Sequence, residues 1–250
     1  MQTKQIKSSG VALGCMTALL SLGACQAPAL QHSAWSQIGE GTSTIGVSSG
    51  WAFYSAEMSA AGQTGVLTGD TGTDNVDLTP RYGGALKGQY FLTDHFALGG
   101  IVELRSFEPD TASPLTADLV ADPFDTVHWI GTSRYFFEPY GKDSRWKPFI
   151  GVDYSYIDQI DFGSVAVNYP APFPAENVDI VAGSYTTIAL VAGTSFLWND
   201  NMSIDMGGFY EWTDKASEVT LTFPNLGGAT ADVVTEPEGL ILFMGATFYF

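Results

Sequence analysis

The chain has 250 residues, and its 27 Asp and Glu residues outnumber its 10 Lys and Arg residues, which gives a formal net charge of −17 at pH 7. This charge argues against nucleic acid as a partner, because phosphate binding needs a basic surface. The 28 glycines and the aromatic content of 13% favour many strands and turns over a helical fold.

Residues 1–24 have the features of a secretory signal peptide. Two lysines precede an apolar run over residues 11–22, and this run is too short to cross a bilayer as a helix. The letters L-G-A-C at residues 22–25 resemble a lipoprotein box. This resemblance implies that Cys25 is lipidated as the first mature residue. Ordinary signal cleavage after Ala29 stays open as the alternative.

Both cysteines of the chain, Cys15 and Cys25, lie in this N-terminal region, so the folded part has neither disulfide nor thiol chemistry. Residues 25–42 show no hydrophobic period, and we expect them to form a periplasmic tether. The segment 43–250 is then a single folded domain.

From residue 43 onward apolar and polar residues alternate, which is the period of β-strands. No apolar run reaches the ~18 residues typical of a membrane helix. Each alternating segment is long enough for a tilted strand to cross a bilayer, which takes about 9–11 residues. We expect eight such strands, at residues 43–55, 81–92, 95–108, 124–138, 147–158, 183–198, 202–213 and 239–250.

The expected connections alternate in length. Short turns join the second strand to the third and the sixth to the seventh, whereas four connections are long and rich in Gly, Pro, Asp and Thr: 56–80, 109–123, 159–182 and 214–238. Short turns at one end and long loops at the other are typical of an up-and-down outer-membrane barrel, whose long loops face outward. Both ends of the domain then lie on the periplasmic side.

The last expected strand is strongly apolar and reads G-L-I-L-F-M-G-A-T-F-Y-F over residues 239–250. An exposed apolar edge strand invites aggregation. We therefore expect both edges of this strand to be paired, as closure of a barrel requires.

Sorting the strands by parity separates an uncharged face from a charged one. The uncharged face includes Ile45, Trp51, Leu104, Trp129 and Ile150. A Lys or Arg facing lipid costs about 2–4 kcal/mol near the bilayer midplane, so we expect the uncharged face to contact lipid. A soluble lipocalin-type barrel with its apolar face inward is the alternative, but the few charges of the other face would cover its surface thinly.

The charged face then lines the barrel interior. An eight-stranded barrel is only just wide enough for its own side chains to fill it, and buried charges are tolerable when they are paired. We expect a cross-lumen network of ion pairs that plugs the barrel, formed by Arg81, Lys87, Glu103, Arg105, Arg134, Asp153, Asp205 and Glu211.

The search for enzymatic or metal chemistry gives weak signals. Outer-membrane lipid A deacylases use an H-x-S pattern, which neither His95 nor His128 shows, so we expect an interior hydrogen-bonded His128 and no enzyme, catalytic residue or cofactor. Asp70, Asp74 and Asp77 lack the ordered spacing of a calcium loop. We expect a solvated acidic loop there and no dedicated metal site.

The expected outer loops contain most of the excess acid, with Lys215 as their one lysine. Divalent cations at these acidic loops could bridge to anionic lipopolysaccharide, or the loops could recognise a cationic partner. Solubility in a salty medium is the simpler explanation, and the three readings stay open.

From Ser43 to Phe250 the chain resembles the small outer-membrane β-barrel family that includes the OmpA transmembrane domain, OmpX and OmpW. The resemblance rests on the eight-strand count, the terminal T-F-Y-F and the hairpin G-Q-Y-F-L-T-D-H-F-A-L-G-G at 88–100. It implies an all-β, eight-stranded antiparallel up-and-down transmembrane barrel in the outer membrane of a Gram-negative-type bacterium. It also implies a monomer, inserted by the barrel-assembly machinery among outer-membrane lipids and lipopolysaccharide. The lipoprotein box departs from the family.

Three functions are compatible with this sequence. The first is a structural or interaction barrel with a plugged lumen that displays acidic extracellular loops. The second is an OmpW-like narrow channel for small hydrophobic compounds, which requires a lateral opening in the wall or an apolar channel beneath the outer loops. The third is a lipid-modifying enzyme, which requires a Ser or an acid beside His128.

Overall fold

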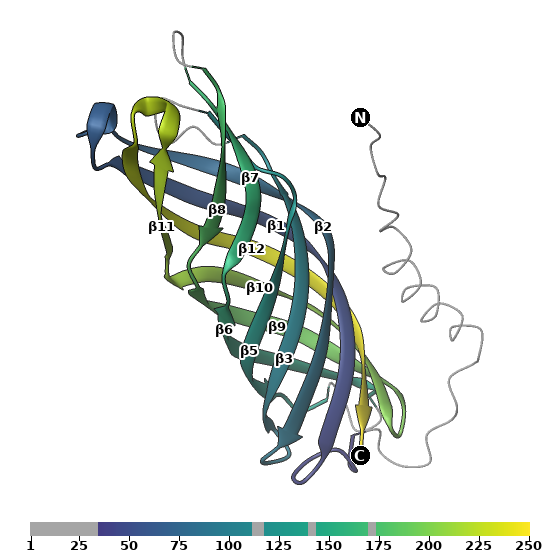
Figure 1. The fold of residues 1–250 in the computed structure, drawn as a ribbon. Helices are drawn as coiled ribbons and strands as arrows, with labels where there is room; N and C mark the ends of the chain where they lie inside the picture. Colours follow the sequence, from purple (N-terminus) through teal and green to yellow (C-terminus); the bar gives the residue numbers. More distant parts are fainter. Residues whose placement is uncertain (1–34, 112–117, 140–143, 170–173) are drawn as a thin grey trace, which may run out of the picture.

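The computed structural model describes residues 35–111, 118–139, 144–169 and 174–250. Eight long antiparallel strands form a closed ring in the order β1-β2-β3-β5-β6-β9-β10-β12, and β12 pairs back with β1 (Figure 1). The expected fold class is therefore confirmed. The ring strands are β1 (Ser43–Gly62), β2 (Thr71–Phe91), β3 (Phe96–Pro109), β5 (Phe124–Phe136), β6 (Trp146–Ile157), β9 (Tyr185–Asn199), β10 (Met202–Lys215) and β12 (Ala229–Tyr249).

The prediction of long loops at one end was wrong, because most of these segments are β-structure. β1 and β2 continue outward to the 3-10 helix η2. β4, β7 and β8 form a separate three-stranded sheet, and β11 pairs with the outer part of β12. All of them gather at the upper end of the barrel in Figure 1. Their bounds are η2 (Gly65–Leu67), β4 (Asp118–Val120), β7 (Ile160–Asn168), β8 (Glu176–Ala182), β11 (Ser217–Phe223) and η3 (Pro224–Leu226).

The physical reason for this error is an inversion of the two faces along the strands. In the middle of the barrel apolar side chains point outward. Beyond it, the buried residues of β2 are the apolar Val76 and Leu78, whereas Glu57 and Asp77 are exposed. Apolar and polar residues still alternate there, but the apolar ones now face inward and the polar ones outward. A search for membrane-facing apolar residues therefore ends the strands too early.

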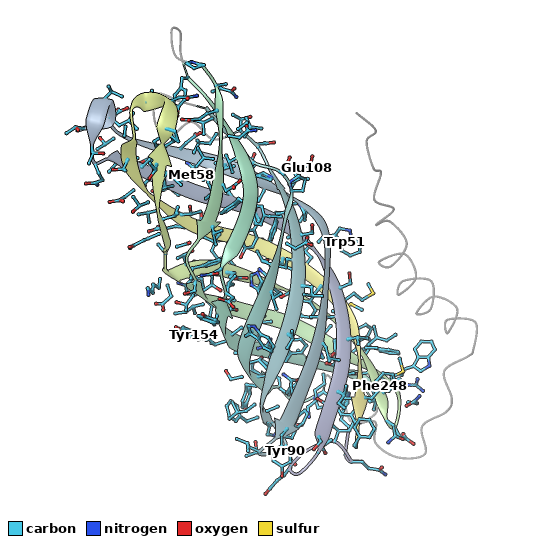
Figure 2. All side chains as sticks on the ribbon, in the orientation of Figure 1. Trp51, Met58, Tyr90, Glu108, Tyr154 and Phe248 are labelled. Atoms are coloured by element: carbon cyan, nitrogen blue, oxygen red, sulfur yellow. The ribbon has the colours of Figure 1, made fainter. Side chains whose placement is uncertain are left out.

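The barrel wall has an apolar outer surface. Trp51, Tyr154 and Phe248, which Figure 2 labels, are 54%, 50% and 42% exposed. Large apolar side chains of all eight ring strands share this exposure, including Leu86, Leu104, Trp129, Ile150, Leu190, Tyr210 and Leu242. Exposed apolar area on this scale marks a surface that meets a membrane. Within the described ranges, no helix is long and apolar enough to cross a membrane.

The opposite end of the barrel has short turns and the chain terminus (Figure 1). The last strand is paired on both edges, with β1 on one side and β10 on the other, as predicted. The backbone N–H of Phe250 donates to the carbonyl oxygen of Ser43 at 2.9 Å. The aromatic terminus is therefore part of the closed sheet.

Candidate functional site

The interior is divided by a layer of charged side chains centred on Arg105. This guanidinium contacts Glu211 (Nη1 to Oε2, 2.9 Å) and Glu103 (Nη2 to Oε2, 2.8 Å). Arg105 lies on β3 and Glu211 on β10, which are four strands apart in both directions around the ring. The Arg105–Glu211 pair therefore crosses the full diameter of the barrel.

Further polar and aromatic contacts complete this layer. The Arg105 Nη1 also donates to the Tyr54 hydroxyl at 3.2 Å, and the Thr187 hydroxyl donates to Glu211 Oε1 at 2.6 Å. The rings of Tyr54 and Phe209 lie 5.7 Å from the guanidinium carbon. Glu211 is fully buried. A buried charge is tolerable when it is paired and hydrogen-bonded, as both oxygens of Glu211 are.

Two further ion pairs lie nearer the short-turn end. Lys87 contacts Asp205 across the lumen, and Asp205 also accepts a hydrogen bond from Thr247 at 2.5 Å. Arg134 binds Asp153 on the neighbouring strand with two hydrogen bonds of 2.5 and 2.8 Å. Seven of the eight residues expected in the lumen thus meet as three separate units instead of one network. The side chain of Arg81 lies outside the described part.

An apolar cavity of about 80 Å³ lies on the outer side of the Arg105 layer. We call it the outer chamber. Tyr54 lines it and also contacts Arg105, so the charged layer forms its floor. Its walls come from the ring strands and from the outer hairpins, and include Met58, Val76, Leu78, Phe124, Phe162, Val165, Ile180, Ala182 and Leu221.

A second cavity of about 70 Å³, the inner chamber, lies between the Arg105 layer and the short-turn end. Glu103 lines it and contacts Arg105, so the same layer is its roof. Both remaining ion pairs line it, and its other walls are aromatic, including Phe91, Phe136, Phe149, Phe243 and Tyr249. The lumen therefore consists of an apolar outer chamber and a mixed inner chamber.

The wall between β1 and β2 is interrupted beside the charged layer. The ladder pairs Ser48 with Ala85 and resumes only at Tyr54 with Leu78, so residues 49–53 of β1 and 79–84 of β2 form no ladder pairs with each other. We call this interruption the seam. A hydrogen bond from the Ser49 hydroxyl to the Gly83 carbonyl, 2.9 Å, bridges it.

The seam connects the levels of the two chambers. Ser48 and Ala85, at its inner end, line the inner chamber, while Tyr54 and Leu78, at its outer end, line the outer chamber. Gly83, inside the seam, is paired with Arg105 on β3. The interruption therefore lies directly beside the Arg105 layer.

Hydrogen bonds link the outer hairpins to each other above the outer chamber. The Tyr169 hydroxyl donates to Glu176, and the second oxygen of Glu176 accepts the backbone N–H of Asn225 at 2.9 Å. Burial, followed by the hydrogen bond to Glu176, raises the pKa of Tyr169. The phenol therefore stays protonated and remains a donor. Tyr169 also packs against Phe223, with ring centroids 6.3 Å apart.

The remaining sequence candidates lie apart from the chambers or lack catalytic partners. His128 is fully buried, its Nε2 lies 3.0 Å from the Thr126 hydroxyl, and its Nδ1 has no hydrogen-bond partner among the described residues. Asp74 and Asp77 are three residues apart on β2, which places them on opposite faces of the strand. The described residues contain no group of three or more His, Cys, Asp or Glu suited to a metal ion. Cys25 lies outside the described residues.

The outer chamber and the seam were not identified from the sequence. Pro80, three residues before Gly83, was the available signal, because a proline within a strand marks an unpaired edge. The predicted strand started at residue 81, which left Pro80 in the expected loop 56–80.

No protein-family model matches the sequence, and the search of curated proteins found no match. Among solved structures, the outer membrane protein OprG from Pseudomonas aeruginosa is similar, with a TM-score of 0.56 and 13% identity over 85% of this chain and 97% of that chain. Neisserial surface protein A gives a TM-score of 0.41 and 15% identity over 84% and 100%. The fold, together with the apolar wall, identifies the chain as a small eight-stranded β-barrel of the outer membrane.

Proposed function

We propose that this barrel takes up small apolar molecules from the cell surface and releases them sideways into the outer membrane. The observation that supports this function is the apolar outer chamber, which ends on the Arg105 layer with the seam beside it. A ligand of the outer chamber cannot pass the charged layer without desolvating paired charges. The seam offers a lower barrier, because it leads from apolar walls to lipid.

This proposal keeps the expectation of a plugged lumen and gives it a role. The charged layer blocks passage along the axis, so water and ions are retained outside while apolar molecules leave through the wall. Mostly apolar walls with a few polar groups are typical of small-molecule sites. The polar atoms at the floor, such as the Tyr54 hydroxyl, are already engaged by Arg105. The chamber therefore favours ligands without charge.

Filling the outer chamber tests the proposal. Ala182 is buried in its wall, whereas the adjacent Val181 is 48% exposed on the outside. We expect Ala182→Trp to weaken binding of the apolar fluorescent probe N-phenylnaphthylamine by about tenfold or more, because the indole occupies the cavity. The measurement is a fluorescence titration of the purified barrel in detergent.

Val181→Trp is the matched control, since it adds the same side chain outside the cavity. It should bind the probe like the parent protein. Equal affinity of the Ala182→Trp and Val181→Trp variants, or no saturable binding by the parent, would contradict an outer-chamber site.

A second candidate function, attachment to lipopolysaccharide through divalent cations, is supported by a belt of exposed acids just outside the apolar wall. Seven of the eight ring strands, or the turn that follows them, contribute to it. Cross-strand like charges, such as the paired Glu57 and Glu236, repel each other unless a cation lies between them. The belt consists of Glu57, Asp77, Glu108, Asp125, Asp158, Asp214, Glu236 and Glu238.

The pair Glu57 and Glu236 allows this second function to be tested. We expect millimolar Mg²⁺ to raise the unfolding temperature of the barrel in lipopolysaccharide-containing vesicles, and the chelator EDTA to reverse the rise. Glu57→Gln together with Glu236→Gln should reduce the Mg²⁺ effect, because the paired carboxylates are gone. An unfolding temperature that responds to Mg²⁺ equally in both proteins would exclude bridging at this pair.

A further inference from the structure

We infer that residues 35–42 form a cap that seals the periplasmic mouth of the barrel and closes the inner chamber from below. This segment was expected to be a tether, and residues 25–34 of that tether lie outside the described chain. The described residues precede β1 and turn back beneath the ring. Trp35 and Ile38 are 6% and 4% exposed. They pack into one apolar cluster with Phe91, Ala97, Phe136, Phe149, Val191, Leu197 and Tyr249.

Backbone hydrogen bonds hold the cap against the short-turn end. The N–H of Gly41 donates to the carbonyl oxygen of Phe91 at 2.9 Å, and the N–H of Glu40 donates to Asp94 Oδ1 at 3.1 Å. Gly41 has a φ of +86°, a conformation that favours glycine. Within the segment, the Ile38 N–H donates to the Trp35 carbonyl at 3.2 Å. The segment is thus an ordered turn that contacts β2, β3 and the turn that connects them.

Lys147 adds a charged contact to the underside of the cluster. Its Nζ lies 5.5 Å from the Trp35 ring and 5.8 Å from the Phe136 ring, which are cation–π distances. The same ammonium donates to the carbonyl oxygen of Asp94 at 3.1 Å. Trp35 also meets Tyr249 edge-on, with centroids 6.2 Å apart. The Trp35 indole therefore connects the N-terminal segment to β6 and to β12.

The consequence is an inner chamber closed at both ends. The Arg105 layer is its roof and the cap is its floor, so the seam is the route that remains for exchange with the membrane. This inference concerns the inner chamber and does not depend on ligand binding in the outer chamber. A failure of the cap and a failure of the uptake proposal are therefore separate results.

Access of a thiol reagent to the inner chamber tests the cap. Thr44 lines this chamber, is 3% exposed, and its hydroxyl has no partner among the described residues, so Thr44→Cys removes no hydrogen bond. In the purified full chain, a charged, water-soluble methanethiosulfonate should modify the introduced thiol slowly. Adding Trp35→Ala and Ile38→Ala should accelerate modification by about tenfold or more, because the floor is removed. The readout is the mass shift of the peptide that contains residue 44.

Gln37→Ala is the matched control, since Gln37 is exposed in the same segment. It should leave the modification rate unchanged. Ile38→Ala alone is the second variant. For every variant, the heat-dependent shift in gel mobility shows whether the barrel is folded. Rapid modification of Thr44→Cys with the cap intact would overturn the inference, and so would an unchanged rate in folded barrels that lack both apolar side chains.

Discussion

Replacing Glu211 with alanine is expected to lower the free energy of unfolding by about 3–5 kcal/mol, because Arg105 would stay buried without its partner across the lumen. Arg105 is 4% exposed, and water cannot replace the lost carboxylate without entering the layer. Thr187 would also lose the acceptor of its hydrogen bond. The measurement is urea-induced unfolding in phospholipid vesicles, followed by tryptophan fluorescence.

The triple variant Arg105→Met with Glu103→Gln and Glu211→Leu separates the cost of an unpaired charge from the cost of altered packing, because Glu103 is the second partner of Arg105. Removing all three charges should recover most of the lost stability, since buried ion pairs are often replaceable by uncharged side chains. Glu57→Ala is the control for loss of an exposed acid and should change stability by less than about 0.5 kcal/mol. A Glu211→Ala barrel as stable as the Glu57→Ala barrel would show that water reaches Arg105.

The wall could be predicted from the sequence because each of its positions faces either lipid or lumen. Strand parity alone therefore separates Trp51 and Ile150 from Arg105 and Asp153, and the structure exposes the first two and buries the others. The closing pair of β1 and β12 followed from the apolar last strand. These conclusions depend on the local period of the chain, which no distant contact can alter.

The pairing of the interior charges depends on strand register and on strand tilt. The alternation of apolar and polar residues along the chain does not determine either of them. Arg134 meets Asp153 on the adjacent strand, whereas Arg105 meets Glu211 across the ring. Parity assigns the same interior face to all four. The outer chamber was missed for a related reason, because its apolar residues face inward and belong to the reversed part of the pattern.

Locking the seam is expected to reduce the transfer of apolar molecules into the outer membrane by about tenfold, since it closes the lateral route. Ser49 and Gly84 directly follow the last ladder pair, Ser48 with Ala85, on the two sides of the seam. A methyl-sized group at Gly84 would meet only the Ser48 carbonyl oxygen, at 3.9 Å, so the site has space for a side chain. Ser49→Cys with Gly84→Cys introduces one thiol on each side of the seam, so that a disulfide between them would join the two strands there.

The oxidised and reduced forms of this double variant are the best comparison, because they share one sequence. Uptake of N-phenylnaphthylamine by intact cells that produce the barrel should be slow when the disulfide is formed and should recover on reduction. Each single-cysteine variant should be insensitive to the reductant. The disulfide leaves the outer chamber untouched, so probe binding to the purified barrel should be equal in both forms. If uptake is also equal in both forms, apolar molecules leave the chamber by another path, and the interruption between β1 and β2 is only a local feature of the wall.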